Sequence, residues 1–284
     1  MSVSNRNIPL PSNANYACFS NKERNSIHAG VFFNHLQQTH FKTLHIQPPA
    51  HTVIIKGNLS WTSTGNTIRE GMAKLIYESC GDHFCSYGRN KRLDPYLCLY
   101  KDCELMLGDN VDVPNGLANG TRGLFKGIKL KAGETSHVTC LDGFYVNSVY
   151  ASQIESLECE HTESKYTGTF SVEPSKKTCS VKMPNPLLEN SDSRINQSIY
   201  ITQIPLIRNL ATTGHKLQGA TKEAIIVSDY LYGKNWIYVV LSRVKTRAGL
   251  FLRDPISKYK LTTTSIDGRL LQHEKWLRDK IKLR

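Results

Sequence analysis

The sequence predicts an α/β fold with a small antiparallel β subdomain inserted in the chain. A strand at residues 16–19 runs directly into a capped helix, which is the basic step of an α/β sheet. The short apolar run at residues 224–227 is typical of a buried parallel strand. Between them, residues 106–200 alternate short β-prone pieces with turn signals. The hydrophobic share of 39% is sufficient for a packed core, which excludes a wholly disordered chain.

The helix after the first strand is predicted within residues 20–38. Ser20 and Glu23 form a capping box at its start, so that both side chains can bond free backbone N–H groups. Its apolar residues recur at helical spacing and are Ile27, Val31, Phe32 and Leu36. Further on, residues 51–56 are strand-like, residues 67–78 predict a short helix, and residues 81–92 predict a loop.

Three strands are predicted in the inserted β subdomain, at residues 123–130, 136–140 and 166–172. Polar loops and Asn-Gly turn signals separate them, and such close spacing is typical of a compact antiparallel unit. Three lysines lie along or close after the first strand, so we expect one basic strand face; they are Lys126, Lys129 and Lys131.

The C-terminal region again shows the alternating strand and helix signals of an α/β domain. Simple propensity predicts a strand at residues 236–241, but a stripe of apolar residues at helical spacing favours a helix over 236–244. Residues 248–252 predict another strand, and residues 269–284 predict a basic amphipathic helix. We therefore expect four segments: the first part of the α/β domain at 1–123, the β subdomain at 124–200, the rest of the α/β domain at 201–260, and the C-terminal helix at 261–284.

The net charge and the length of the apolar runs reduce the number of protein classes that fit the sequence. The 36 Lys and Arg against 24 Asp and Glu give a formal net charge of +12, which favours a polyanionic partner such as nucleic acid. The charge alone does not separate this from an incidentally basic protein. No apolar run approaches the roughly 18 residues of a membrane helix. The polar N-terminus has no signal-peptide core, so we expect an intracellular protein without a membrane partner.

Eight cysteines raise the question of disulfides or a metal. Without a signal peptide, we interpret them as reduced thiols. Two Cys-x4-Cys pairs stand close together, formed by Cys80, Cys85, Cys98 and Cys103. Zinc sites prefer tighter pairs, and the last two cysteines lie in apolar stretches. We therefore expect no metal and keep a zinc centre as the alternative.

Three motifs carry a resemblance: ATTGHKLQGAT at 211–221, IYVVLSRV at 237–244 and MLGDNVDVPNGLANGTRG at 106–123. Together they resemble the C-terminal half of Pif-type (petite integration frequency) DNA helicases, a superfamily 1 group. That family has a His-Lys-x-Gln-Gly-x-Thr motif before a Tyr-Val-x-Leu-Ser-Arg-Val motif, and an Asn-Gly-rich segment before both. Residues 203–206 and 18–30 also fit, so the resemblance covers most of residues 15–255.

The resemblance implies a second RecA-like helicase motor domain with an inserted small β-barrel. Such a domain reaches toward ATP with an arginine that neutralises charge on the transferring phosphoryl group. Arg243 stands at that position as the expected catalytic residue, on the edge of the apolar helix; a surface salt bridge is the alternative. Gln218 and Gly219 match nucleotide-binding positions, since an amide offers a donor and an acceptor and glycine allows close approach.

The resemblance also implies DNA contacts. His215, Lys216 and Thr221 match positions that meet the strand or support the cleft, and lysine and threonine are ordinary phosphate contacts. In the family the inserted barrel, of Src-homology type, lies near the DNA. Its entry turn and first strand therefore supply three further candidates, Asn119, Arg122 and Lys126. A polar turn or a solvated strand face is an equal alternative for these residues.

Three residues depart from the family pattern, and one of them, Val240 in place of a small residue, is a mild change. Gly214 and Leu217 stand where many members carry an apolar residue and a serine. Leu217 removes one hydroxyl that could bind phosphate, and Gly214 is expected to loosen the backbone before His215.

A P-loop needs Gly-x4-Gly-Lys-Ser/Thr, because its amides wrap the phosphates and its lysine neutralises them. The sequence contains no such string and no Asp-Glu pair for Mg²⁺. We therefore expect only the second motor half in this chain. ATP and Mg²⁺ would be used only with a P-loop domain supplied in cis or in trans, and the chain alone would be inactive.

Three functional hypotheses stay open. The first is a motor half of an ATP-dependent DNA helicase, with family roles in DNA repair, recombination and telomere maintenance. The second is a non-catalytic module that binds single-stranded nucleic acid. The third is a decayed remnant of a mobile-element helicase. The expected partners are single-stranded DNA and a P-loop-bearing helicase half. The expected location is the nucleus, with the mitochondrion as the alternative.

Overall fold

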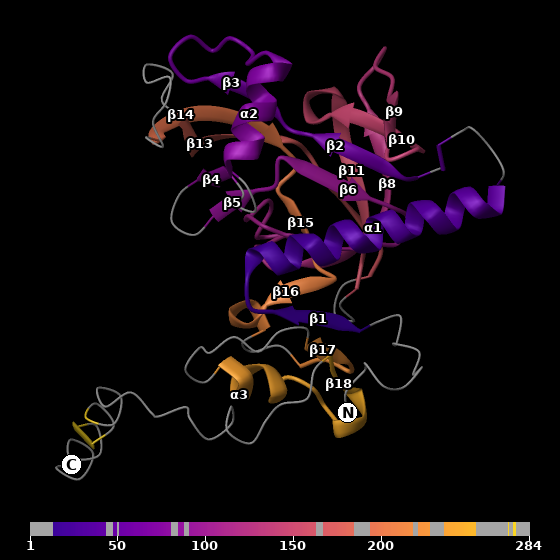
Figure 1. Ribbon diagram of the computed structural model, residues 1–284, viewed down its shortest axis with the longest axis vertical. Coiled ribbons are helices and arrows are strands. Elements are labelled where there is room, and N and C mark those ends of the chain that lie inside the picture. Colours follow the sequence, from indigo (N-terminus) through magenta and orange to yellow (C-terminus); the bar gives the residue numbers. More distant parts are fainter. Residues whose placement is uncertain are drawn as a thin grey trace. The chain divides into compact units, whose positions relative to one another are not determined.

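The computed structural model describes most of the chain: residues 14–43, 48–49, 51–80, 85–87, 91–162, 167–184, 194–217, 221–227, 236–253, 272 and 275–276. The chain divides into two compact units, one formed by Met1–Arg24 with Ala211–Arg284 and the other by Asn25–Leu210 (Figure 1). No helix in the described residues is long and apolar enough to cross a membrane.

The first unit is built on a four-stranded parallel sheet in the order β16, β1, β17, β18. Its strands are β1 (Asn15–Cys18), β16 (Ala211–Thr213), β17 (Ile225–Val227) and β18 (Leu250–Leu252). All three residues of β17 are buried, as expected where parallel strands are covered on both faces. The predicted strands at residues 16–19, 224–227 and 248–252 are confirmed.

The short helix α3 (Trp236–Leu241) packs in the apolar cluster of this sheet. Trp236, Ile237 and Val240 are buried together, which confirms the helix over the strand that propensity predicted. Two 3₁₀ turns flank the sheet, η3 (Gly214–Leu217) after β16 and η4 (Arg247–Gly249) before β18.

The long helix α1 (Asn21–Thr43) begins directly after β1 and continues into the second unit. The predicted cap is confirmed, because the backbone N–H of Glu23 donates to Ser20 Oγ at 3.2 Å. The Glu23 carboxylate accepts from the backbone N–H of Phe19 at 3.1 Å. Farther along, Phe32 and Leu36 are buried against Ile54 and Val146 of the second unit.

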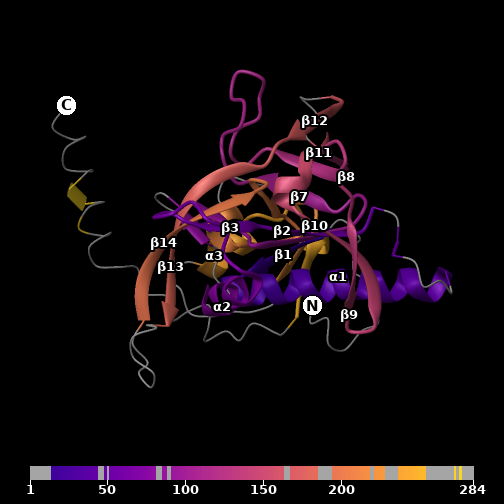
Figure 2. The same cartoon turned by 90° about the horizontal axis from the view of Figure 1, so that it is seen from above.

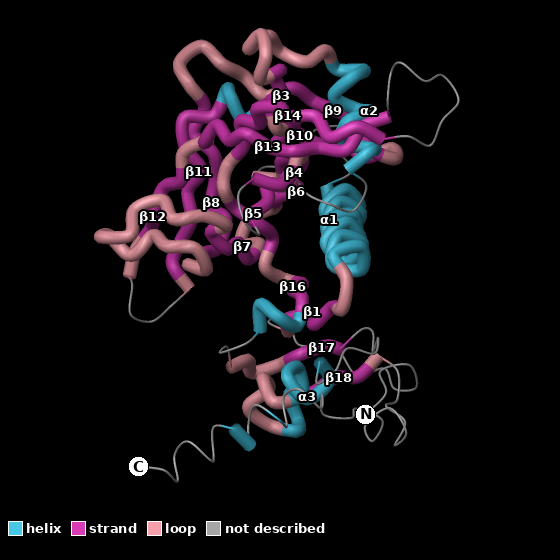
Figure 3. The backbone as a smooth tube through the Cα atoms, turned by 90° about the vertical axis from the view of Figure 1, so that its left-hand side faces the viewer, coloured by secondary structure: helices cyan, strands magenta, loops and turns pink. Residues whose placement is uncertain are grey.

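The described residues of the second unit form three sheets. The sheet nearest α1 has the order β6 (Tyr96–Leu99), β2 (Val53–Lys56), β10 (Phe144–Tyr150), β9 (His137–Leu141). In this sheet only β2 and β10 pair in parallel. Figure 3 shows α1 running beside these strands.

The next sheet is antiparallel throughout, in the order β12 (Thr169–Val172), β11 (Ile154–His161), β8 (Arg122–Leu130), β7 (Glu104–Leu107), β15 (Leu206–Arg208). Its apolar face and that of the preceding sheet share one core, in which Phe125 and Leu97 are buried. The strand predicted at residues 123–130 is confirmed as β8, and residues 136–140 and 166–172 contain most of β9 and all of β12.

The last sheet has the order β3 (Asn58–Trp61), β14 (Arg194–Gln203), β13 (Ser175–Pro184), β4 (Cys85–Tyr87), β5 (Lys91–Leu93). β13 and β14 form a long antiparallel hairpin, which curves along one side of Figure 2. Helix α2 (Glu70–Cys80) covers the sheet, with Ile76 buried against Ile199 and Val181. The prediction of a helix over residues 67–78 is confirmed with a shift toward the C-terminus.

Two expectations differ from the structure, and two others are not tested by it. The loop predicted at residues 81–92 was wrong in its described part, because β4 forms there by pairing with β13, far away in sequence, and β5 pairs with β4. The four sheets of the described residues are open, so no closed barrel is observed. The two compact units divide near residues 24 and 210. The segments expected at 1–123, 124–200, 201–260 and 261–284 stay predictions. The helix predicted at residues 269–284 lies largely outside the described residues.

Candidate nucleotide and nucleic-acid sites

Arg243 lies in the turn after α3, not on the helix itself, because the helix ends at Leu241. Its Nε donates to the carbonyl of Val239 at 3.1 Å and to Ser242 Oγ at 3.2 Å, and its Nη2 donates to the same hydroxyl at 3.0 Å. The half-buried guanidinium therefore folds back on its own turn, where these partners are neutral oxygens. The salt bridge considered as an alternative is not observed among the described residues.

Backbone hydrogen bonds tie this turn to the segment that follows the 211–221 motif. The N–H of Lys222 donates to the Arg243 carbonyl at 2.8 Å, and the N–H of Lys245 donates to the Lys222 carbonyl at 3.0 Å. An ion pair between Lys245 and Glu223 joins the same two segments. The fold thus brings Arg243 close to Thr221, which is exposed. These two motifs, separated in sequence, meet within the first unit.

Packing explains the glycine at position 214 and the leucine at position 217, which the sequence alone did not reveal. A Cβ on Gly214 would lie 2.3 Å from Nε1 of Trp236, so a residue without a side chain is needed where the indole packs against η3. Leu217 is buried in the same cluster as Trp236. The expectation that Gly214 loosens the backbone is therefore replaced by a steric requirement, and the hydroxyl-free Leu217 is a core residue.

The remaining candidates of the 211–221 motif are less fully described. His215 and Lys216 lie on η3, directly after β16, but their side chains are outside the described part. Gln218 and Gly219 lie wholly outside it. Their nucleotide-binding and DNA-binding roles stay predictions.

The predicted entry turn at Asn119 belongs to the second unit and is confirmed. The N–H of Thr121 donates to the Ala118 carbonyl at 3.0 Å, and Gly120 has a φ of 98°, which suits glycine. Asn119 is exposed at the corner of this turn. Arg122 begins β8, and its Nε is buried without a hydrogen-bond partner among the described residues.

The lysines of β8 do not form the expected basic face. Lys126 Nζ lies 2.7 Å from Asp102 Oδ1 and 2.6 Å from Glu160 Oε2, and these carboxylates raise the lysine pKa. Lys129 Nζ lies 2.7 Å from Glu155 Oε1 on the neighbouring strand. The face is charge-balanced, because Glu155 and Glu160 on β11 and Asp102, in the turn before β7, form ion pairs with these lysines. Lys126 would have to leave two ion pairs to contact a phosphate.

Three described cysteines of the second unit are buried thiols (Cys103, Cys159 and Cys179), whereas Cys98 is partly buried and Cys140 is exposed. Burial raises the pKa of Cys98 to about 12 and raises that of Cys103. A thiol that stays protonated is a poor metal ligand. In the described part of the chain, no group of three or more His, Cys, Asp or Glu side chains is placed to hold a metal ion. Cys80 and Cys85 have side chains outside that part.

Solved structures of Pif1 helicases share this fold. The chain matches Bacteroides Pif1 bound to ssDNA with a TM-score of 0.56 at 16% identity, over 97% of this chain and 48% of that one. It matches Bacteroides Pif1 in complex with ADP-AlF3 and ssDNA with a TM-score of 0.55 at 17% identity, over 96% and 48%. For Pif1 from Candida albicans the TM-score is 0.55 at 17% identity, over 96% and 52%.

The fold is that of part of a Pif1 helicase. The resemblance predicted from the motifs is thereby confirmed in the fold, and the mixed α/β sheets match helicase motor structures. The chain spans about half the length of the solved Pif1 structures that it matches. No protein-family model matches the sequence, and no curated protein matches it either.

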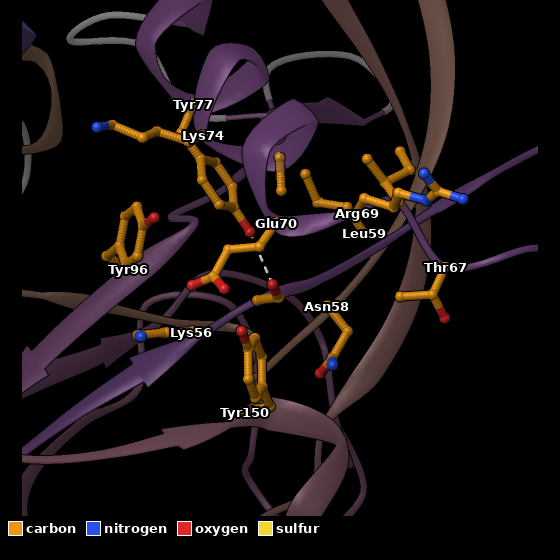
Figure 4. A pocket seen from close by; sticks show the side chains of 13 residues that line it. Lys56, Asn58, Leu59, Thr67, Arg69, Glu70, Lys74, Tyr77, Tyr96 and Tyr150 are labelled. Atoms are coloured by element: carbon orange, nitrogen blue, oxygen red, sulfur yellow. Dashed lines mark hydrogen bonds between the residues drawn. The ribbon is translucent and has the colours of Figure 1, made fainter. Parts of the chain in front are cut away.

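The second unit also contains a cavity of about 380 Å³ that the sequence did not predict. Strands β2, β3 and β6, helix α2 and the end of β10 surround it, and three tyrosines line it: Tyr77, Tyr96 and Tyr150 (Figure 4). Lys56 and Glu70 bring opposite charges to the same walls. Its residues come from segments almost a hundred positions apart, so no local motif could have indicated it.

A buried arginine cluster links α1 to the sheets of the second unit. Arg208 Nη1 donates to the Cys98 carbonyl at 2.7 Å, and the guanidinium lies 5.0 Å from the Tyr100 ring centre. His35 of α1 stacks on the Tyr100 ring, with the two ring centres 4.3 Å apart. Burial and the nearby guanidinium lower the pKa of His35. This cluster fixes α1 on the sheet and has a structural role.

Proposed function

We propose that the chain is the second motor half of an ATP-dependent DNA helicase of the Pif type. The observation that carries the proposal is the backbone ladder between Lys222 and the turn of Arg243, which unites two motifs of that family in one place. The parallel sheet beneath them and the fold of the Pif1 structures support the same conclusion. The Bacteroides structures contain ssDNA and ADP-AlF3, and we extend both ligand classes to this chain.

In this proposal Arg243 is the residue that acts on the nucleotide. Its guanidinium now bonds a carbonyl and a hydroxyl, whereas a phosphoryl group offers charged oxygens that form stronger hydrogen bonds. The side chain therefore gains by leaving its own turn when a nucleotide is present. Gln218 contributes a polar contact with the nucleotide, and Gly219 lets the backbone approach it closely. A P-loop domain, in cis or in trans, supplies the phosphate cradle and the Mg²⁺ site.

Single-stranded DNA is the proposed substrate strand. His215, Lys216 and Thr221 on the first unit, with Asn119 and Arg122 on the second, are the proposed contacts. Lys126 is the candidate that the structure supports least, since two carboxylates hold its ammonium group. The β-rich second unit takes the role of the family's inserted barrel. A nuclear or mitochondrial location and work in DNA repair, recombination or telomere maintenance belong to the same proposal.

The test is a salt titration of DNA binding by the whole chain, together with an ATP hydrolysis assay. We expect binding of a labelled single strand to weaken linearly, on logarithmic scales, between about 50 and about 200 mM salt. We expect no hydrolysis above buffer with Mg²⁺, ATP and DNA present, because the groups that grip phosphate and metal are missing from the sequence. A chain that ignores DNA at every salt concentration is not a helicase half.

The missing P-loop string favours one second candidate, a non-catalytic module for single-stranded nucleic acid. Both candidates bind DNA, but only the motor half responds to a P-loop partner. If a P-loop domain restores no hydrolysis while DNA binding persists, the binding module is the better description. A decayed remnant, the third hypothesis, would fail to bind DNA or fail to fold.

A further inference from the structure

The tyrosine-lined cavity of the second unit has a rigid aromatic wall. Tyr77 on α2 is fixed by its hydroxyl, which donates to the Gly57 carbonyl at 2.7 Å. Its ring lies 4.7 Å from the ring of Tyr96, centre to centre, with the planes tilted by 58°. Tyr96 on β6 is 40% exposed and lines the cavity. The volume of about 380 Å³ lies within the usual range of small-molecule sites, roughly 300–1,000 Å³.

Opposite charges border this wall. Lys56 Nζ lies 5.7 Å from the ring centre of Tyr150, and Glu70 lies on the first turn of α2. Burial raises the pKa of Tyr150, and the charge of Glu70, which lines the same cavity, raises it further. Figure 4 shows the Glu70 and Lys56 heads on the same side as Tyr96 and Tyr150, whereas Arg69 lies on the opposite side.

Each wall component selects a ligand feature. Aromatic rings stack with flat π systems, and such stacking is a principal source of affinity for single strands. The ammonium group of Lys56 attracts a phosphate. The carboxylate of Glu70 accepts hydrogen bonds, as carboxylates do from the N4 amino group of cytosine. A free amine would leave Lys56 unmatched, and an anion without N–H groups would be repelled by Glu70.

We propose that this cavity binds one nucleobase of a single DNA strand, and that it prefers bases with an exocyclic amino group over thymine. Thymine presents carbonyl oxygens on both sides of its only N–H, and these face the Glu70 carboxylate unfavourably. The inference rests on the proposed function only in taking single-stranded DNA as the ligand. It adds a base-selective site that none of the helicase motifs includes.

The test compares labelled oligodeoxycytidine and oligothymidine, each about 12 nucleotides long, by fluorescence anisotropy with the full chain. We expect oligodeoxycytidine to bind about fivefold or more tightly, the lower end of discrimination by a base-edge contact. Glu70→Gln should bring this ratio close to one, because an amide offers both a donor and an acceptor. Free deoxycytidine monophosphate should compete far more weakly than the strand. Competition equal to that of the strand would overturn the strand as the occupant.

A tyrosine pair supplies a matched control. Tyr96→Ala should weaken binding of both oligonucleotides by about five- to 150-fold, the range for loss of one stacked base. Tyr145→Ala should leave binding unchanged, because Tyr145 has a similar exposure of 38% on β10 but does not line the cavity.

The outcomes separate this inference from the proposed function. Equal binding of the two oligonucleotides, with Tyr96→Ala as tight as the wild type, overturns the base pocket and leaves DNA binding intact. Loss of all DNA binding by the wild type overturns both. If a melting curve shows that Tyr96→Ala has lost its fold, the ratio measured with Glu70→Gln decides, because that side chain is exposed.

Discussion

Replacing Gly214 by alanine tests how the first unit holds its two motifs together. The new Cβ would lie 2.3 Å from Nε1 and 2.9 Å from Cδ1 of Trp236. Ordinary contact begins at 3.4 Å, so the indole or the η3 turn must shift by about 1 Å. Trp236 is only 6% exposed and also contacts Phe19 edge-on at 5.9 Å, so it has little room to move.

The expected cost follows from this overlap. Forcing an extra methyl group into a packed core costs about 1–3 kcal/mol, which exceeds the ~0.4–1 kcal/mol that alanine gains over glycine by restricting the unfolded chain. At about 2–4 °C per kcal/mol, the melting temperature should fall by up to about 10 °C. Gly30→Ala is the matched control. It lies within α1 with nothing within 4 Å of the new Cβ, and we expect it to raise the melting temperature slightly.

The assay is thermal unfolding by circular dichroism for the two alanine variants and for a double variant. In a Trp236→Leu background the clash is removed, so Gly214→Ala should become neutral or stabilising. The two sites are in contact and should therefore show a coupling energy of about 1 kcal/mol or more. A Gly214→Ala protein as stable as the wild type would refute the steric account of this glycine.

Three further outcomes are expected in the second unit. The lowered pKa of His35 means that the unfolded chain binds more protons below pH of about 6.5, so stability should fall as pH drops through that value. His35→Gln should flatten this part of a melting-temperature series. Arg208→Met should cost about 1–3 kcal/mol in urea unfolding, because the partly buried carbonyl of Cys98 loses its donor; an unchanged midpoint would contradict this. Lys126→Gln should leave the salt dependence of DNA binding unchanged. If the slope of log binding constant against log salt concentration became smaller by about one, Lys126 would be a phosphate contact.

Signals between close neighbours predicted the structure well. The Ser20 cap, the turn at Asn119 and the apolar stripe of α3 depend on residues within a few positions of one another, and all three are confirmed. These local signals did not predict where α3 ends. Periodicity continued to residue 244, but the chain leaves the helix at 241 to pair its backbone with Lys222.

Pairings between distant segments were not predictable from the sequence. The lysines of β8 looked solvated, because the opposing Glu160 becomes a neighbour only after β8 and β11 pair. Strands β4 and β5 looked like a loop, because Ser86 pairs with Ser180. Gly123 has a steric reason of the same kind as Gly214, since a Cβ at this position would lie 2.8 Å from the ring of Phe170. The cavity of the second unit depends on tertiary contacts in the same way.

The central claim is that Arg243 belongs to an ATP-hydrolysing motor that is completed by a P-loop domain. The most direct measurement is steady-state ATP hydrolysis by the chain fused behind the P-loop half of Bacteroides Pif1. We predict DNA-stimulated hydrolysis that falls by about 10³-fold or more with Arg243→Ala, as for arginines that stabilise a transferring phosphoryl group. Arg247→Ala, an exposed arginine on η4, should leave the rate unchanged. Equal rates with and without Arg243 would contradict the account.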